Sequence, residues 1–226
     1  MAPNRRTALV AGLLFLVTHV TSIAALVLYD PVLNDTGYIT GAGADGRIAL
    51  GAWLEGILAM AVAGTAVTLY PVVKRQQRSM ALGYVALRTL EGSMILLGLV
   101  ALLAVVTLRR DGVGDVAVGQ ALVAVHDWSF LVGPAFVLGV NTFLLAYLMF
   151  RSGLVPRYIG ALGMFGGPLV AVSATLTLFD VYGQVSAWGL VLAVPVFAWE
   201  LNLAFWMVIK GFRPAAAILQ PNQAIA

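Results

Sequence analysis

Six uninterrupted apolar runs leave this chain few folds to choose from, because each run is long enough to cross a lipid bilayer. A bilayer core about 30 Å thick requires about 20 apolar residues in a helix. Strands of a transmembrane barrel would instead show about ten residues of alternating polarity. We therefore predict an all-α, polytopic transmembrane helical bundle of six spans. A single transmembrane domain over residues 1–226 is expected, with spans at 7–29, 48–73, 79–108, 117–150, 156–179 and 186–210.

The composition agrees with a chain that is surrounded by lipid. Hydrophobic residues make up 61% of the sequence and charged residues only 10%, whereas soluble domains have about 45–50% and about 25%. No cysteine is present, which excludes disulfides and thiolate metal sites. The net charge of +3 does not come from a basic patch with stacking aromatic residues, so we expect no nucleic-acid partner.

The distribution of lysine and arginine predicts the orientation of the bundle. Cytosolic loops of membrane proteins carry an excess of these residues. One set of flanks has nine of them and the opposite set has three, so both termini are expected in the cytosol. The nine are Arg5, Arg6, Lys74, Arg75, Arg78, Arg151, Arg157, Lys210 and Arg213, and the three are Arg47, Arg109 and Arg110.

Ionisable residues inside the spans are the main candidates for a functional site. One such residue at the centre of a helix costs about 2.5–3.5 kcal/mol in insertion experiments, so these side chains are expected to face the bundle interior. Four acids are the candidate catalytic residues, and three bases are candidates for substrate binding. The acids are Glu55, Glu91, Asp127 and Glu200, and the bases are Arg88, His19 and His126.

Depth in the membrane predicts which of these groups meet. Arg88 and Glu200 each lie ten residues from a cytosolic basic residue, or about 15 Å along a helix. They are therefore expected to pair between the third and sixth spans. Glu91 is three residues after Arg88 and shares its helix face, so Arg88 is expected to bridge two carboxylates. Alternatively, such a buried ion pair has no role in chemistry and only fixes the register between helices.

The remaining acids have no cation at their depth. Glu55 and Asp127 are therefore expected to carry the proton in any proton-transfer chemistry. His126 precedes Asp127, and neighbouring side chains diverge by about 100° on a helix, so the two are not expected to face one point. His19 has no second histidine at metal-binding spacing, and we expect it to be a hydrogen-bonded core residue with no metal or cofactor.

Aromatic and kink-forming residues suggest an apolar cavity. Trp199 and Asn202 lie on one stripe of the last span, and with Trp53 and Trp128 they are candidate substrate-binding residues. Helix packing, or an interfacial position for Trp128, explains these residues equally well. Two Gly-Pro pairs, at 133–134 and 167–168, predict kinks that either allow close packing or shape a cavity.

Short motifs spread along the chain resemble a known family. They are Asn4-Arg5-Arg6-Thr7-Ala8, Asp30-Pro31-Val32-Leu33-Asn34, Tyr70-Pro71-Val72-Val73-Lys74, Ala81-Leu82-Gly83-Tyr84, Arg88-Thr89-Leu90-Glu91-Gly92, Asp127-Trp128 with Gly133-Pro134, Val155-Pro156-Arg157 and Lys210-Gly211-Phe212. The chain resembles a family of bacterial integral membrane proteins catalogued as a domain of unknown function. The resemblance implies a multi-pass protein of the bacterial cell (inner) membrane and implies no activity.

Three functions fit these residues. The first is acid-catalysed cyclisation or isomerisation of an apolar, isoprenoid-like substrate, by analogy with the architecture of small membrane-bound terpene cyclases. The second is a proton- or cation-coupled small-molecule transporter, for which a homodimer is expected. The third is a non-catalytic membrane partner, sensor or immunity-type protein, so whether the chain is an enzyme stays open. The expected partners are the lipid bilayer and an apolar small molecule.

Overall fold

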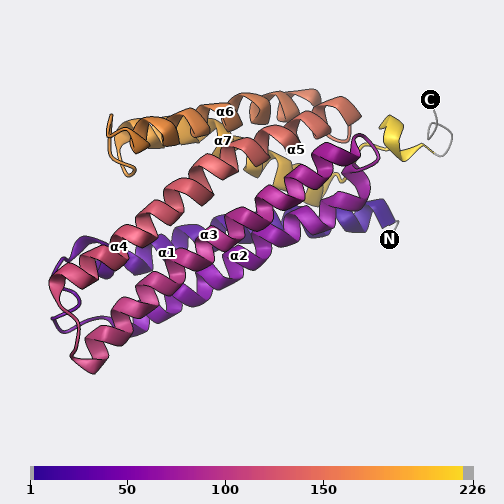
Figure 1. Ribbon diagram of the computed structural model, residues 1–226. Helices are drawn as coiled ribbons and strands as arrows, with labels where there is room; N and C mark the ends of the chain where they lie inside the picture. Colours follow the sequence, from indigo (N-terminus) through magenta and orange to yellow (C-terminus); the bar gives the residue numbers. More distant parts are fainter. Residues whose placement is uncertain (1–2, 221–226) are drawn as a thin grey trace.

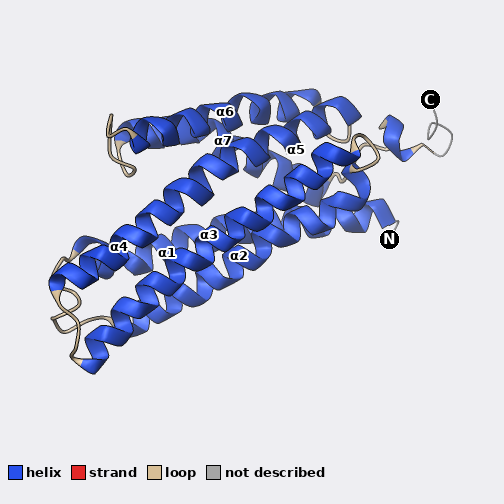
Figure 2. Ribbon diagram, in the orientation of Figure 1, coloured by secondary structure: helices blue, strands red, loops and turns tan. Residues whose placement is uncertain are grey.

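The computed structural model describes residues 3–220, and this part of the chain is helical and contains no strand (Figures 1 and 2). Six segments are long and apolar enough to span a membrane, which confirms the predicted fold class. The elements are α1 (Pro3–Asn34), α2 (Asp45–Val73), α3 (Arg78–Asp111), α4 (Val116–Phe130), the π-helical η1 (Leu131–Val137), α5 (Leu138–Ser152), α6 (Arg157–Leu178), α7 (Ala187–Ile209) and the short 3-10 helix η2 (Ala217–Leu219). The segment α4–η1–α5 is one continuous span, Val116–Ser152.

The helices run alternately along one bundle (Figure 1). The start of α1, the α2–α3 and α5–α6 turns and η2 gather at one end, called here the terminal end. The loops at 35–44, 112–115 and 179–186 gather at the opposite end, the loop end. An even number of spans in residues 3–220 places the start of α1 and the end of α7 on one side of a membrane, and that this side is the cytosol stays a prediction.

The outer surface of the bundle is apolar, as lipid contact requires. Large side chains point outward from several helices, among them Met60 on α2 at 73% exposure and Phe165 on α6 at 62%. Water would penalise so many exposed apolar groups, whereas lipid tails do not. The lipid bilayer is therefore the environment that this surface fits.

Helix α1 is longer than the apolar run that predicts it, and it continues through Pro31 to Asn34. Pro31 has no N–H to donate to the carbonyl of Val27 four residues earlier. The guanidinium of Arg47, at the start of α2, donates to that carbonyl oxygen instead, at 2.9 Å. Asn34 further stabilises the last turn by donating to Asp30 at 2.9 Å, so the loop expected from residue 30 begins only after residue 34.

Small residues allow close contact between α5 and α6. A Cβ atom added to Gly167 would lie 2.6 Å from the carbonyl oxygen of Gly139, and the reverse distance is also 2.6 Å. On another face of α6, a Cβ at Gly166 would lie 2.7 Å from the backbone nitrogen of Val196 in α7. The second Gly-Pro pair therefore lies where three helix backbones pack closely.

The first Gly-Pro pair lies in the π-helical segment η1. A proline inside an α-helix collides with the carbonyl four residues earlier, and a wider turn relieves the collision. Pro134 lines the central cavity described below, while a Cβ at Gly133 would lie 2.5 Å from the Cβ of Met94 on α3. Here the same irregular turn serves both packing and cavity shape.

One cluster of polar side chains holds the loop end together. Asp45, at the start of α2, accepts from Arg109 Nε at 2.8 Å and from Arg110 Nε at 2.9 Å, both at the end of α3. Arg109 also donates to the carbonyl of Gly41 at 2.9 Å. Tyr38 donates its hydroxyl to Asp45 at 2.9 Å. The 35–44 loop is thereby attached to two helices.

The close helix contacts predict opposite effects for two Gly→Ala substitutions. Gly56 has no atom within 4 Å of an added Cβ, so Gly56→Ala should leave stability unchanged or raise it by up to about 1 kcal/mol. Gly167→Ala should lower the free energy of unfolding by about 1–3 kcal/mol, because the new methyl meets backbone. Thermal melting in detergent measures both, and equal stability of the two variants would contradict the packing described.

The loop-end cluster predicts a late titration of Tyr38. The pKa of Tyr38 is raised from its ordinary value of 10.0 to about 12. Burial is the larger cause, and the hydrogen bond to Asp45 is the second. The protonated phenol therefore stabilises the fold fully below pH 10, and this stabilisation is lost as the pH rises through about 12. Ultraviolet difference titration of the wild type against Tyr38→Phe isolates this phenol, and Asp45→Asn should shift its titration to lower pH.

Candidate functional site

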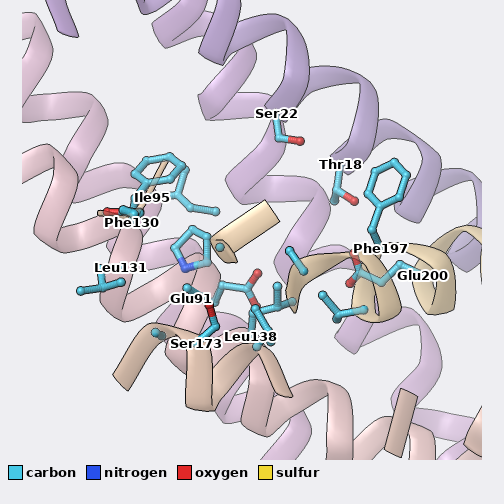
Figure 3. A pocket seen from close by; sticks show the side chains of 18 of the residues that line it. Thr18, Ser22, Glu91, Ile95, Phe130, Leu131, Leu138, Ser173, Phe197 and Glu200 are labelled. Atoms are coloured by element: carbon cyan, nitrogen blue, oxygen red, sulfur yellow. The ribbon is translucent and has the colours of Figure 1, made fainter. Parts of the chain in front are cut away.

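A cavity of about 370 Å³ lies in the middle of the bundle, between α1, α2, α3, the span α4–η1–α5, α6 and α7 (Figure 3). Its walls toward the loop end are largely apolar and include Ile95, Phe130 and Leu131. Its deep end, toward the terminal end, carries ionisable side chains from three different helices. These are His19 on α1, Arg88 and Glu91 on α3, and Glu200 on α7.

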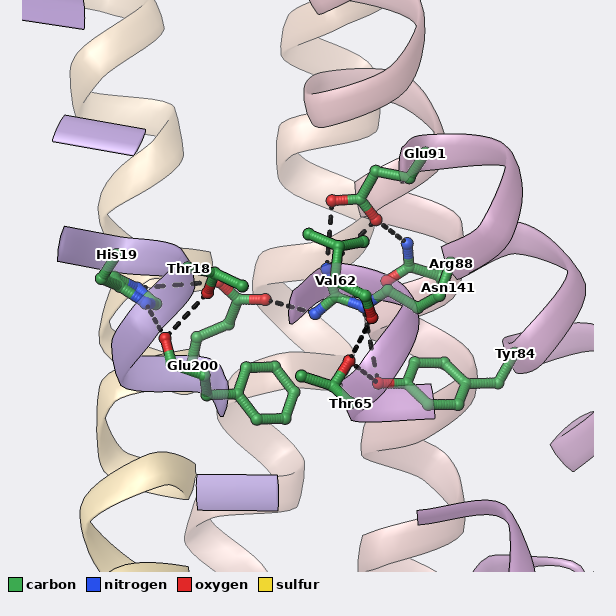
Figure 4. A network of polar contacts seen from close by, with 10 residues as sticks. Thr18, His19, Val62, Thr65, Tyr84, Arg88, Glu91, Asn141 and Glu200 are labelled. Carbon is green, nitrogen blue, oxygen red and sulfur yellow. Dashed lines mark hydrogen bonds and ion pairs between the residues drawn. The ribbon is translucent and has the colours of Figure 1, made fainter. Parts of the chain in front are cut away.

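Arg88 joins the two carboxylates of this cavity (Figure 4). Its Nη1 donates to Glu91 Oε1 at 3.0 Å and Oε2 at 3.1 Å, and its Nη2 donates to Glu200 Oε1 at 2.8 Å. Arg88 and Glu91 are each only 3% exposed. The two contacts predicted from depth and helix spacing are therefore present. A buried cation between two carboxylates compensates part of the desolvation of all three groups.

A chain of hydroxyl groups orients the guanidinium of Arg88 from the other side. Arg88 Nε lies 3.5 Å from the hydroxyl of Tyr84, which lies 3.3 Å from that of Thr65. Thr65 donates to the carbonyl of Val62 at 2.7 Å, so Tyr84 must donate to Thr65 and accept from Arg88. The guanidinium also lies 5.3 Å from the centre of the Phe15 ring, which is cation–π distance.

Asn141 on α5 completes the surroundings of Glu91. Its amide nitrogen donates to Glu91 Oε2 at 2.5 Å, while its own Oδ1, fully buried, has no hydrogen-bond partner in the structure. Asn141 was not among the site residues predicted from the sequence. The signal was available, because Asn141 is an isolated amide in an apolar run, ten residues before Arg151, and hence at the depth of Arg88.

His19 and Glu200 face each other across the deep end of the cavity. Nδ1 of His19 lies 2.8 Å from the carbonyl oxygen of Phe15, and because a carbonyl only accepts, Nδ1 carries the ring hydrogen. Nε2 faces Glu200 Oε2 at 3.6 Å. Without a further proton, two lone pairs would face each other there. Nε2 of His19 and Oε2 of Glu200 are thus positioned to share one proton.

One bound proton balances the formal charges of this cluster. Arg88 contributes one positive charge, and Glu91 and Glu200 contribute two negative ones, which leaves a net charge of −1. A proton held between His19 and Glu200 brings the sum to zero, whichever of the two carries it. A low-dielectric interior favours the neutral cluster, so the cluster can accept one proton or another single positive charge.

A second cavity of about 670 Å³ adjoins the first toward the loop end. Glu55 lines it, is 2% exposed, and accepts a hydrogen bond from the hydroxyl of Tyr29 at 2.8 Å. Among the described residues Glu55 forms no ion pair, as expected from its depth. The two cavities share the lining residues Ser22, Phe130 and Gln184.

His126 and Asp127 both line this outer cavity. The expectation that they would face different points is wrong, because His126 Nδ1 lies 3.0 Å from Asp127 Oδ1. Rotation of the two side chains about their own bonds overcomes the 100° between their Cα–Cβ directions. The ring stacks on Phe130 at 4.6 Å between centroids, and its buried Nε2 has no partner in the structure.

The predicted site residues are thus divided. Glu91 and Glu200 share the central cavity, and Glu55 and Asp127 share the outer one. The predicted aromatic and amide residues line neither cavity. Trp199 is buried against Gly163 of α6, while the others point outward: Trp53 at 64% exposure, Trp128 at 51%, and Asn202, which donates to Ala198 of its own helix.

Within residues 3–220, no three histidine or acidic side chains are grouped so that they could hold a metal ion. The groups that the structure does bring together are ion-paired, hydrogen-bonded or facing a cavity. What they can do chemically is bind a proton, bind a cation, or donate a proton to an apolar molecule.

Comparison with known proteins identifies the family. The family model described as Domain of unknown function (DUF4386) matches residues 10–211. The chain belongs to this DUF4386 family. A curated relative, an uncharacterized protein of Archaeoglobus fulgidus, is 29% identical over 105 residues, which cover 45% of this chain and 60% of that relative. No solved structure matches the chain.

Membership of DUF4386 confirms the resemblance derived from the motifs, and the six spans make the chain a multi-pass membrane protein. The site motif Arg88-Thr89-Leu90-Glu91-Gly92 lies within the matched residues. The family description names no activity, and the buried ionisable groups of this chain gather in the two cavities. The bacterial cell membrane as the location stays a prediction.

The ion cluster predicts a strong stability effect at Arg88. Arg88→Met should lower the free energy of unfolding by about 3–5 kcal/mol, because it leaves two buried carboxylates without their cation. Arg151→Met, at an exposed arginine on α5, is the matched control and should change little. The triple variant Arg88→Met, Glu91→Gln, Glu200→Gln should regain much of the loss. An Arg88→Met protein as stable as the control would contradict the cluster.

Proposed function

We propose that the central cavity is the binding site of a proton-coupled transporter, which exchanges one proton for one small organic cation. The observation that carries this proposal is the His19–Glu200 contact at 3.6 Å, where a carboxylate oxygen that is not bound to Arg88 faces an imidazole nitrogen. Glu200 has one oxygen bound to Arg88 and the other free for that charge. A proton and a cation would therefore compete for the same carboxylate oxygen.

Arg88 supports such an exchange because it keeps the net charge at −1 rather than −2. Two unpaired carboxylates would hold a cation too strongly to release it, because the low local dielectric strengthens the attraction between opposite charges. With Arg88 bound to Glu91 and to one oxygen of Glu200, a single charge is exchanged. This is the condition for a one-for-one coupling of proton and cation.

The irregular helices around the cavity also favour a transporter. The π-helical turn η1 lines the cavity with Leu131 and Pro134, and α7 has Pro195 one residue before the cavity-lining Val196. Transporters commonly place interrupted helices at their binding sites, where a turn can change its hydrogen bonds during access. The homodimer expected for a six-span carrier belongs to this proposal.

A second candidate is acid-catalysed cyclisation or isomerisation of an isoprenoid-like substrate. Glu55 favours it, because this carboxyl lines a cavity and is bonded only to the hydroxyl of Tyr29. A carbocation would also require aromatic faces. Phe130 and Phe197 supply two in the central cavity, while the predicted tryptophans point elsewhere. We therefore rank this candidate below the transporter.

Proton release on cation binding tests the proposal. Purified protein in weakly buffered detergent should release about one proton per bound ethidium, followed with a pH-sensitive dye. Glu200→Gln should abolish the release, because it removes the carboxylate for which both compete. Asp180→Asn, at an exposed acid of the loop end, should release protons as the wild type does.

Other outcomes favour the other candidates. Turnover of prenylated substrates that is lost in Glu55→Gln, without proton release by cations, would support acid catalysis. Glu200→Gln that changes only the melting temperature, with neither proton release nor turnover in the wild type, would leave the ion cluster as a device for helix register. Either result would overturn the transporter.

A further inference from the structure

The central cavity reaches the outer surface of the bundle between α1 and α7. Three residues that line it are also exposed: Ile23 on α1 at 55%, and Leu190 and Phe197 on α7 at 65% and 45%. Both helices are membrane-spanning segments, so these side chains lie at lipid depth. We call the opening bordered by Ile23, Leu190 and Phe197 the lateral window.

The packing of α1 and α7 explains why the window lies on one half of the bundle. Near the terminal end the two helices are in close contact, since a Cβ on Gly12 would lie 2.8 Å from the carbonyl oxygen of Ala204. His19 and Phe197 then meet edge to face, with ring centroids 5.0 Å apart. Beyond this contact, toward the loop end, the cavity opens outward between Ile23 and Leu190.

The polarity of the cavity changes along its length. All of its charged lining groups lie at the deep end, namely Arg88, Glu91 and Glu200, with His19 beside them. The walls between this end and the lateral window are largely apolar, and the border of the window carries no charge. A molecule that fits this profile has a single positive group at one end and an apolar chain at the other.

We propose that the cation is an amphiphile dissolved in the membrane, and that it enters the central cavity sideways through the lateral window. This inference rests on the proposed function and names its substrate class. The positive group replaces the proton at Glu200, which keeps the ion cluster neutral. The apolar chain extends from Glu200 past Phe197 and Leu190 toward the lipid.

The outer cavity offers a separate route for the displaced proton. It is lined by Glu55, Asp127, His126 and Arg47, and it joins the central cavity at Ser22. A charged lining suits water and protons and disfavours an apolar chain. The structure thus supplies one apolar and one polar route to the same pair, His19 and Glu200.

The absence of cysteine from the sequence makes the test direct, because single cysteines can be introduced and labelled without a background. Leu190→Cys labelled with a pyrene maleimide obstructs the lateral window. Met60→Cys with the same label is the control, since Met60 is 73% exposed on α2 and lines neither cavity. Asp127→Cys with a water-soluble maleimide obstructs the outer cavity.

Proton release in nanodiscs is then followed by stopped flow with two probes, dodecyltrimethylammonium and the water-soluble tetraethylammonium. Labelled Leu190→Cys should slow the release caused by dodecyltrimethylammonium about tenfold, while labelled Met60→Cys leaves it unchanged. Labelled Leu190→Cys should have little effect with tetraethylammonium, which reaches the site from water. Normal release with the second probe also shows that the labelled protein is folded.

Two results would overturn the inference. One is release by dodecyltrimethylammonium that is insensitive to the Leu190 label and is slowed by the Asp127 label, which would place access at the loop end. The other is release by tetraethylammonium alone. If neither probe releases a proton, the proposed exchange itself fails, so the two failures can be told apart.

Discussion

The ion cluster around Arg88 is the interaction on which the rest of this structure depends. A guanidinium and two carboxylates cannot remain in a lipid-surrounded bundle unless they contact one another. Their contacts link α3 to α7 through long side chains, and Asn141 adds α5. Because hydroxyl groups of Tyr84 and Thr65 occupy the other side of Arg88, the free oxygen of Glu200 is left to face His19. The chemistry of the central cavity follows from this one unsatisfied position.

The helices around the cluster are held by contacts of a different kind. In lipid, burying apolar surface between helices gains little, so close approach of small residues takes the place of a hydrophobic core. Gly139 with Gly167, and Gly12 with Ala204, bring backbones into contact. Where α1 and α7 lack such contact, toward the loop end, a cavity and its lateral window remain. The positions of the small residues therefore explain why α1 and α7 pack closely at the terminal end and leave open space toward the loop end.

Much of the site could be predicted because a helix converts sequence distance into depth at a constant rise per residue. Arg88 and Glu200 were expected at one depth and do pair, and Glu91 was expected on the face of Arg88. The same reasoning could have found Asn141. Sequence distance does not tell which way a side chain points around its helix. Trp199 and Trp53 were therefore expected beside a ligand, whereas Trp199 packs against α6 and Trp53 points outward toward lipid.

The sequence alone determined the environment, the number of spans and the depth of each charged group, since these depend on length, hydropathy and helical rise. Only the tertiary structure decided which groups share a cavity. It divided four acids between two adjoining spaces, joined His126 to Asp127, and opened the bundle between α1 and α7. These outcomes depend on helix rotation and on side-chain torsions. Both are set by contacts between residues far apart in the chain, which no local pattern records.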